Sequence, residues 1–534
     1  MKRPNILWIT ALALGWFFDF LFWKHAPGIN FAIYVVLCLA GGFLVLGLEG
    51  IRPHWRALLL LVPIGFFAAM TFVRLESLTQ FLSVILTLGA MSVLAVTYLG
   101  GRWLRYGFSD YVAAFFKLAG SMLARPIMFL NERKKAAPAA ESSGDAAAAR
   151  RSRWKRFWAV VRGVLIAIPV VALFAALLAS ADAVFAQRLD EFLTLFRLDR
   201  LPEYIFRAVY IVIGAYLLAG VFLHAALKSR DEKLVGEDKP LVAPFLGFTE
   251  AAIVLGALEV LFLFFVAIQV RYFFGGQTNI SVAGYTYAQY ARRGFGELVA
   301  VAFFSLLLIL AMSAIVRRES PARRWAFSGL GIGLVALIAV ILVSAFQRLG
   351  LYEAAYGFTR LRTYTHVFMI WLGVLLAAVV VLEILRRERF FVAAMVLAGI
   401  GFAASLALLN VDGFIVRQNV ARAPDGKGLD VAYLASLSSD AVPALVADFR
   451  DAKLPGMTRD AVGAVLVCRQ HTYSGRTGTD WQGFTLSRWR ADQAMAQVKA
   501  RLDQYRVDEA GWPTKVYTPG SVMYECEGSG SAGE

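Results

Sequence analysis

The sequence has few of the residues from which soluble enzymes build catalytic or metal sites. Of its 534 residues only 17% are charged, five are histidine and three are cysteine. No nucleotide-binding loop, haem attachment motif or nucleophile elbow occurs. The histidines are far apart on different expected elements, which leaves a metal site unsupported: His25, His54, His224, His366 and His471. The sequence therefore assigns no catalytic residue, metal or cofactor.

Long apolar runs are what the sequence has instead. Hydrophobic residues make up 59% of the chain, which indicates an integral membrane protein. Eleven runs approach the ~20 residues that an α-helix needs to cross ~30 Å of hydrocarbon. We therefore expect an all-α polytopic membrane protein with about 11 transmembrane helices. The expected spans are Ile6–Trp23, Asn30–Leu48, Ala57–Phe72, Thr79–Tyr98, Phe157–Leu178, Tyr204–Leu227, Phe245–Val270, Leu298–Val316, Phe327–Phe346, Tyr364–Leu385 and Phe390–Leu409.

A small soluble domain follows the last apolar run, over residues 411–534. It holds 14 Lys and Arg against 15 Asp and Glu, so its net charge is close to neutral, which argues against nucleic-acid binding. Apparent strands at Gly463–Cys468 and Val522–Cys526, with helices over 429–450 (divided at Pro443) and 487–506, predict an α+β fold.

The soluble domain contains two cysteines, Cys468 and Cys526. In an oxidising compartment they would pair and close a long loop. Two separate thiols are the alternative.

Lys and Arg collect mainly in alternate loops between the spans. With a cytoplasmic N-terminus, the inside segments hold 27 of these residues and the outside loops hold 11. The positive-inside rule then predicts an extracytoplasmic C-terminal domain after eleven spans. Without the 12 Lys and Arg of the central loop, 102–156, the inside segments hold 15 such residues and the outside loops hold 11. One miscounted span would therefore reverse the assignment. The first span is read as a retained anchor, because bulky Phe20, Phe22 and Trp23 stand where a cleavage site needs small residues.

The central cytoplasmic region divides the membrane part into an N-terminal four-helix segment, 1–100, and a seven-helix core, 157–410. Residues 101–131 repeat apolar side chains at intervals of three and four, which predicts an amphipathic interfacial helix. A helix packed against the bundle is the alternative. Residues 132–156 form a basic, Ala- and Ser-rich linker that anionic lipid could hold, although simple solvation explains the same composition.

Glu259 lies near the middle of an expected span, where a charge costs ~2.5 to 3.5 kcal/mol on insertion scales. It belongs either to a proton or cation pathway or to a hydrogen-bonded contact between helices. Asp19 poses a weaker form of the same problem, close enough to a span end to reach water or Lys24.

The outer loops are unusually rich in aromatic and polar residues. Their arginines could hold an anionic headgroup or phosphate, while interfacial anchoring by Tyr and Arg explains the same composition. The candidate substrate or ion-pathway residues, besides Glu259, are Asp182, Gln269, Arg271, Tyr287, Tyr290, Arg292, Arg293, Glu297, Arg360, Arg362 and His366.

Several motifs in the outer part of the chain resemble a known family. They are LLASADAVFA at 177–186, YFFGG at 272–276, YAQYARRGF at 287–295, RLGLYEAAYGFTRLR at 348–362, LNVDGFIVRQNVAR at 409–422 and LDVAYLASLSSDAVPAL at 429–445. The chain resembles the bacterial membrane family called domain of unknown function 4173, which is related to family 4153. The resemblance implies a bacterial inner-membrane location and supplies no catalytic residues.

Three functional hypotheses remain open from the sequence. The first is handling or transport of an anionic or lipidic substrate on the envelope side. The second is a non-transporting scaffold or sensor whose C-terminal domain binds an envelope protein. The third is an intramembrane transferase that uses Asp182, Arg292 or Glu297, although nothing in the spacing identifies a nucleophile or base.

Overall fold

The structure is a computed structural model that describes residues 3–136, 201–230, 234, 244–274, 295–317, 320–423, 428–473, 480–509 and 511–527, with scattered residues between 163 and 188. Within these residues, eleven helices are long and apolar enough to cross a membrane. This confirms the predicted polytopic all-α architecture with a small C-terminal α+β part. The eleven are not the expected set, because Phe108–Glu132 is among them and the expected span 157–178 lies outside the continuously described residues.

The chain divides into two compact units, and the first contains residues 1–23, 37–51 and 116–228. Within it, α1 packs on α9 with Gly15 at the contact, where a Cβ would lie 2.6 Å from the Ile211 carbonyl oxygen. Asp19 is buried, and it binds Arg207 (Nε to Oδ1 2.9 Å) and the Tyr210 hydroxyl instead of Lys24. The helices that contribute to this unit are α1 (Pro4–Phe22), α2 (Ile29–Leu48), α6 (Phe108–Ala136) and α9 (Leu201–Leu227).

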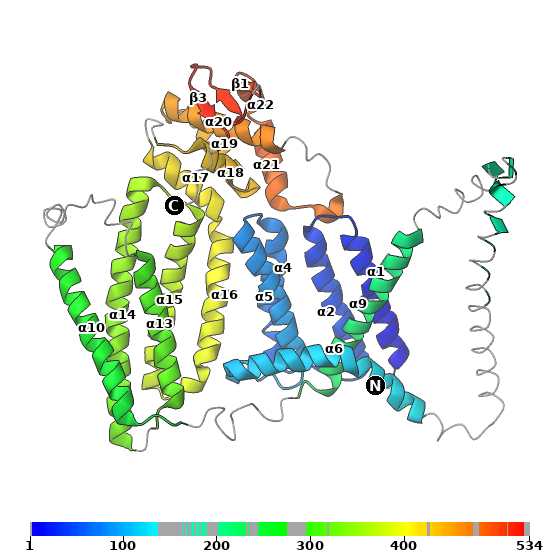
Figure 1. Cartoon of the computed structure of the whole chain (residues 1–534), viewed down its shortest axis with the longest axis horizontal. Helices are drawn as coiled ribbons and strands as arrows, with labels where there is room; N and C mark the ends of the chain where they lie inside the picture. The colour runs from blue at the N-terminus through cyan, green and yellow to red at the C-terminus, as the bar shows by residue number, and fades with distance from the viewer. Residues whose placement is uncertain are drawn as a thin grey trace. The chain divides into compact units, whose positions relative to one another are not determined.

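Helix α6 runs across the other helices of the first unit and not alongside them (Figure 1). It crosses α9 closely, because Gly220 has no side chain and a Cβ there would lie 2.5 Å from Met122 Cα. His224 Nδ1 lies 2.7 Å from Ser121 Oγ at the same crossing. Exposed apolar side chains, among them Phe116, line the uncovered face of α6. The contact with α9 matches the alternative of a helix packed against the bundle, and Phe108–Glu132 is itself long and apolar enough to cross a bilayer, so the interfacial helix stays a prediction.

The second unit contains residues 24–36, 52–115 and 229–534. The expected four-helix segment 1–100 is therefore divided, because α1 packs on α9 whereas α4 and α5 pack with α16. The membrane-length and connecting helices of the second unit are α3 (Trp55–Leu58), α4 (Leu61–Val73), α5 (Ser77–Val96), η1 (Trp103–Arg105), α10 (Phe248–Phe274), α13 (Phe295–Ile315), α14 (Pro321–Tyr356), α15 (Arg360–Ile384), η4 (Glu388–Phe390) and α16 (Phe391–Leu409).

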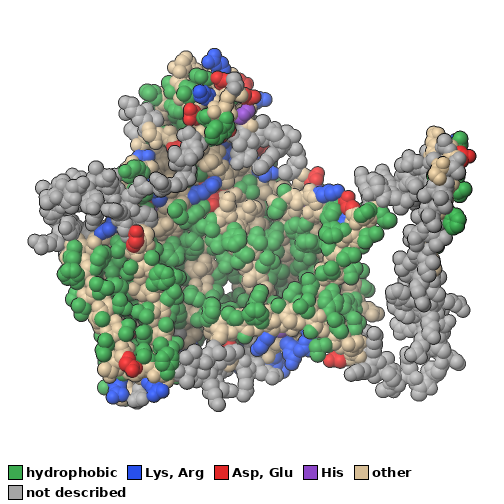
Figure 2. Space-filling model, in the orientation of Figure 1, with side chains coloured by type: hydrophobic (Ala, Val, Ile, Leu, Met, Phe, Trp, Pro, Cys, Tyr) green, Lys and Arg blue, Asp and Glu red, His purple; other side chains and the backbone are tan. Residues whose placement is uncertain are grey.

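The bundle of the second unit packs through a buried apolar cluster that joins α10, α13, α14 and α15. Leu306, Leu334, Ile338 and Ile341 in this cluster are at most 2% exposed. Around it, apolar side chains cover the lateral surface, whereas Lys and Arg gather toward the helix ends (Figure 2). An apolar belt between charged ends is the surface that a lipid bilayer requires.

The C-terminal domain begins one residue after α16. Asn410 adopts a left-handed conformation (φ 53°), and its side chain accepts a hydrogen bond from the Gly413 N–H, so that α17 starts in a new direction. Its three short strands form an antiparallel sheet in the order β1-β2-β3. The elements are α17 (Val411–Arg422), α18 (Val431–Ser436), η5 (Ser439–Ala441), α19 (Val442–Arg450), α20 (Gly456–Tyr473), η6 (Trp481–Gly483), α21 (Leu486–Ala496), α22 (Lys499–Leu502), β1 (Arg506–Asp508), β2 (Lys515–Tyr517) and β3 (Met523–Glu525).

Two details of this domain differ from the sequence expectation. The predicted strand Gly463–Cys468 is wrong, because the segment lies in α20. Its apolar run is buried on all sides, and periodicity alone does not separate a buried helix from a buried strand. The single helix expected over 487–506 ends at Ala496 and resumes as α22, and its last residue belongs to β1. The division of 429–450 into two helices, with Pro443 in the first turn of α19, is confirmed.

Asp448 gives this domain a pH-dependent stability. Burial raises its pKa from 3.8 to about 6, and its Oδ2 is buried without a hydrogen-bond partner among the described residues. The folded state thus holds the proton more tightly than the unfolded chain does. The contribution of Asp448 to the free energy of unfolding is therefore largest below the pKa of the unfolded chain, and it is lost as the pH rises through about 6.

Replacement of Asp448 by Asn should remove this dependence and raise the free energy of unfolding at pH 7 by about 1 to 3 kcal/mol. The free energy of unfolding is measured by denaturant titration in detergent at pH 4.5 and 7.5, with proteolysis of the C-terminal domain as the readout of unfolding. The exposed Asp503→Asn is the matched control and should behave as the wild type. An identical pH dependence in Asp448→Asn and the wild type would show that Asp448 ionises freely in the folded state.

Candidate functional site

Three sequence motifs that are separate along the chain meet where the bundle of the second unit joins the C-terminal domain. Residues 348–362 end α14 and begin α15, residues 409–422 form α17, and residues 429–445 form α18, η5 and the start of α19. Gly357 makes the turn after α14 with φ 83°, and a Cβ there would lie 2.7 Å from Asn419 Oδ1. The Asn419 amide in turn bonds both backbone groups of Phe358. The junction is thus built by close backbone contact.

An ion pair between Arg360 and Asp412 lies at this junction. Arg360 donates from Nε to Asp412 Oδ1 (2.8 Å) and from Nη2 to Oδ2 (2.7 Å). The Asp412 side chain is 0% exposed and also accepts from the Ser438 N–H at 2.7 Å. The Arg360 N–H donates to the Tyr433 hydroxyl, and burial raises the pKa of that tyrosine. One arginine at the start of α15 therefore holds α17, α18 and the approach to η5.

A second acid, Asp440, binds the turn between α4 and α5. Its Oδ2 accepts from the backbone N–H of Leu75 (2.7 Å) and Glu76 (3.0 Å), and its Oδ1 lies 3.8 Å from Arg74 Nη1. Glu76 caps α5 and accepts from the hydroxyl of Tyr364, one turn after Arg360. We call this set the junction network: Arg74, Glu76, Arg360, Tyr364, Asp412, Tyr433, Ser438 and Asp440.

Another polar cluster lies between α10, α14 and α15. His366 Nδ1 is 3.1 Å from Oε2 of Glu353, which is 2% exposed. Arg348 donates to Gln269 Oε1 at 2.8 Å. The guanidinium of Arg362 stacks over the Tyr352 ring at 4.1 Å. Of the candidates predicted from the sequence, the structure thus gathers Arg360, Arg362, His366 and Gln269 at one end of the bundle.

Glu259 faces a different environment. Its Oε1 lies where a Cβ on Gly333 of α14 would be 2.6 Å away. Gln269 is ten residues on, ~15 Å along the helix. The buried cluster that joins α10 and α14 between them includes apolar Phe262 and Ile338. The contacts of Glu259 suit the helix-packing alternative, and its role in an ion pathway stays a prediction.

The remaining candidates lie elsewhere or outside the described part. Tyr287, Tyr290, Arg292, Arg293 and the side chain of Arg271 lie outside the described residues. Glu297 is exposed in the first turn of α13. Asp182, in the first unit, accepts from the N–H of Val184 at 2.7 Å and Phe185 at 3.1 Å, as a local cap does.

Sequence reasoning missed the acids of the junction network. Asp412 and Asp440 are inside the recognised motifs, which was the available signal. Glu76 carries no local signal, since its partner Tyr364 is 288 residues away. Among the described residues, no group of three or more His, Cys, Asp or Glu is placed to hold a metal ion.

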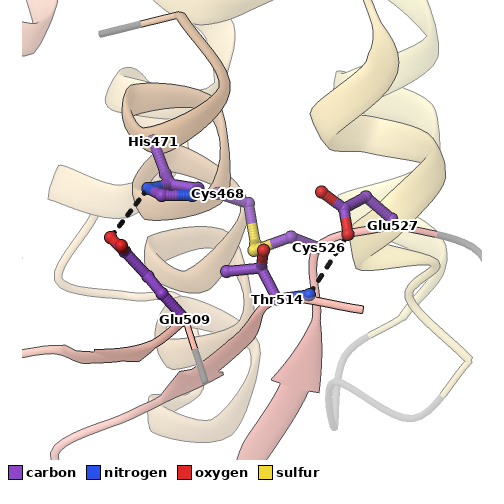
Figure 3. Close-up of a disulfide and its surroundings, with 6 residues drawn as sticks. All are labelled: Cys468, His471, Glu509, Thr514, Cys526 and Glu527. Carbon is purple, nitrogen blue, oxygen red and sulfur yellow. Dashed lines mark hydrogen bonds and ion pairs between the residues drawn. A yellow bond between two sulfur atoms is a disulfide. The ribbon is translucent and has the colours of Figure 1, made fainter. Parts of the chain in front are cut away.

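A disulfide joins α20 to the end of the small sheet (Figure 3). The bond joins Cys468 and Cys526, for which the sequence left a disulfide and two separate thiols open; the two residues are 58 positions apart, and their Cα atoms lie 5.1 Å apart. Beside it, His471 Nδ1 lies 3.3 Å from Glu509 Oε1, and the Thr514 N–H donates to Glu527 Oε2 at 3.1 Å. These contacts hold the last strands on the helical core of the domain.

The membrane-length helices and the junction network define a class: a multi-span membrane protein with a small α+β domain fixed to the end of its bundle. The chain belongs to the family Domain of unknown function (DUF4153), whose sequence model matches residues 61–447. The match contains all three motifs of the junction, and it confirms the predicted relation to family 4153. No curated protein and no solved structure matches the chain.

Proposed function

We propose that this protein is a membrane-embedded platform that presents its C-terminal domain to a protein partner of the cell envelope. The observation that carries the proposal is the buried Arg360–Asp412 pair, which with Ser438 and Tyr433 fixes the domain to the bundle. A domain that only hangs from the last helix needs no such contact. The charge of Arg360 is already neutralised by a carboxylate, so it is not available to bind a substrate.

The orientation and location belong to the same proposal. We place the protein in the bacterial inner membrane, with a cytoplasmic N-terminus and an extracytoplasmic C-terminal domain. The distribution of Lys and Arg supports the orientation, and so does a disulfide, which an oxidising compartment permits. The motif resemblance to family 4173 supports the bacterial membrane.

The surface of the domain offers aromatic side chains for such contacts. Trp489 on α21 is 50% exposed, and Trp512 before β2 is 74% exposed. Large exposed aromatic residues are enriched in protein interfaces, where they act as anchors. These two tryptophans are the positions at which we expect a partner to bind.

Substrate handling at the bundle is the second candidate. It is favoured by one observation, the cluster in which His366 pairs with buried Glu353 beside Arg362 and Gln269. A histidine and a carboxylate in contact can hold a polar substrate group by hydrogen bonds. An anionic or lipidic substrate is the class that the arginine of this cluster would select.

Complementation of a deletion strain separates the two candidates. If the platform is correct, the double variant Trp489→Ala/Trp512→Ala should lose at least half of the rescue of the deletion phenotype, and His366→Gln should keep it. Both chains must reach wild-type levels in the membrane by immunoblot. Lost rescue in His366→Gln, with full rescue by the tryptophan variant, would contradict the platform and favour substrate handling.

A further inference from the structure

A cavity lined by three arginines opens at the end of the bundle opposite to the C-terminal domain. Helix α14 begins there at Pro321, and α15 ends there at Ile384, whereas their other ends meet at the junction network. The cavity has a volume of about 750 Å³ and lies entirely within the second unit. Its charged and aromatic lining is Arg324, Trp325, Glu383, Arg386 and Arg389, and Ser313 and Ser328 are its serines. We call it the arginine cavity.

The backbone at Arg386 is unusual. This residue follows the C-cap of α15 with φ 54°, in the left-handed region where helix ends normally carry glycine or asparagine. The conformation brings its guanidinium over the Trp325 ring, 5.0 Å from the centroid. The arginine at position 386 thus keeps its guanidinium at the cavity although glycine would adopt this left-handed conformation more easily.

The charge of the cavity is positive. Three guanidinium groups line it, against the one carboxylate of Glu383. That carboxylate accepts a hydrogen bond from Ser328 Oγ at 2.5 Å. The excess positive charge and the guanidinium geometry match a phosphate group, which arginine binds by charge-assisted hydrogen bonds.

The rim of the cavity is apolar on the side of the bilayer. Trp325 and Ile384 line the cavity and are 65% and 62% exposed, and Leu385, next to Ile384 in the chain, is 58% exposed. Tryptophan next to arginine, with exposed aliphatic side chains beside them, is typical of residues at the headgroup level. Figure 2 shows hydrophobic side chains along these helices above the Lys and Arg at their ends. A ligand with a phosphate and an apolar tail fits this combination.

We infer that the arginine cavity binds the phosphate of an anionic phospholipid from the leaflet opposite to the C-terminal domain. Arg324, Arg386 and Arg389 hold the phosphate, and the acyl chains lie along the exposed apolar surface next to Ile384. The open, apolar rim favours a lipid over a soluble phosphate compound. This inference is independent of the platform proposal, because the two sites lie at opposite ends of the bundle.

Arg386→Gly is the decisive variant, because it removes a guanidinium while relieving the backbone. The protein is purified in neutral detergent and titrated with phosphatidylglycerol, and bound lipid is counted by native mass spectrometry. We expect Arg386→Gly to weaken binding about fivefold, the effect of one arginine near an anionic surface. Its thermal stability without lipid should equal or exceed that of the wild type. Arg387→Gln, an exposed neighbour outside the cavity lining, should bind as the wild type does.

Two further ligands distinguish the sources of the phosphate. Phosphatidylcholine should bind at least fivefold more weakly than phosphatidylglycerol, and millimolar inorganic phosphate should not displace the lipid. Equal binding of phosphatidylglycerol by Arg386→Gly and the wild type would overturn the site. Equal affinity for phosphatidylcholine would overturn the selection by charge, and displacement by inorganic phosphate would overturn the lipid as the ligand.

Discussion

Asp412→Ala is expected to lower the free energy of unfolding of the bundle end and the C-terminal domain by about 3 kcal/mol. The carboxylate is 0% exposed and accepts from Nε and Nη2 of Arg360 and from the Ser438 N–H. Its removal leaves a guanidinium and a backbone donor without their acceptor in a site that water reaches poorly. Arg360 retains 27% exposure of its side chain, which places the effect at the lower end of the range for buried pairs.

Thermal unfolding in detergent and protease release of the C-terminal domain measure this loss. The double variant Arg360→Met/Asp412→Leu should recover the part of the loss that comes from the unpaired guanidinium, because an apolar pair of similar size has no charge to bury, whereas the Ser438 N–H still lacks its acceptor. Asp451→Ala, an exposed acid of the same domain, should change stability by less than about 0.5 kcal/mol. If Asp412→Ala is no less stable than Asp451→Ala, the domain is not held by this pair.

Features that depend on residues close together in the sequence could be predicted from it. The membrane-length helices follow from the lengths of the apolar runs, and the break in 429–450 follows from Pro443. The strand assigned to 463–468 failed because burial on every side removes the periodicity that distinguishes a helix from a strand. The expected partners of Asp19, water or Lys24, were wrong for another reason. Its partner Arg207 is 188 residues away, and no local pattern connects the two.

The candidate site shows the same limit. Arg360 and Arg362 were chosen for their residue type in an outer loop, but type alone does not say what neutralises an arginine. In the structure Arg360 forms an ion pair with Asp412, and the guanidinium of Arg362 stacks over the Tyr352 ring. Arg360 thus belongs to the junction that holds the C-terminal domain, and substrate binding by either arginine stays a prediction. The arginine cavity was likewise beyond the sequence, because its arginines come from α14, from the turn after α15 and from η4, at positions up to 65 residues apart.

The disulfide supplies the second large effect. The bond closes a loop with a sequence separation of 58 residues. By the loop-closure estimate, its removal should cost the C-terminal domain about 4 kcal/mol. The double variant Cys468→Ala/Cys526→Ala avoids leaving a lone thiol, and the same loss should follow addition of a reductant to the wild type. Both are compared by denaturant unfolding, with a Cys38→Ala chain as the common background.

The same bond tests the orientation in living cells. In the Cys38→Ala background, Cys468 and Cys526 are the only cysteines in the chain. After rapid acid quenching, a maleimide of high mass should modify them only if reductant is added first, because an extracytoplasmic domain keeps them oxidised. Full modification without reductant would place the domain in a reducing compartment. That result would reverse the assignment from Lys and Arg, and with it the proposal of an envelope partner, while the Arg360–Asp412 junction would still fix the domain to the bundle.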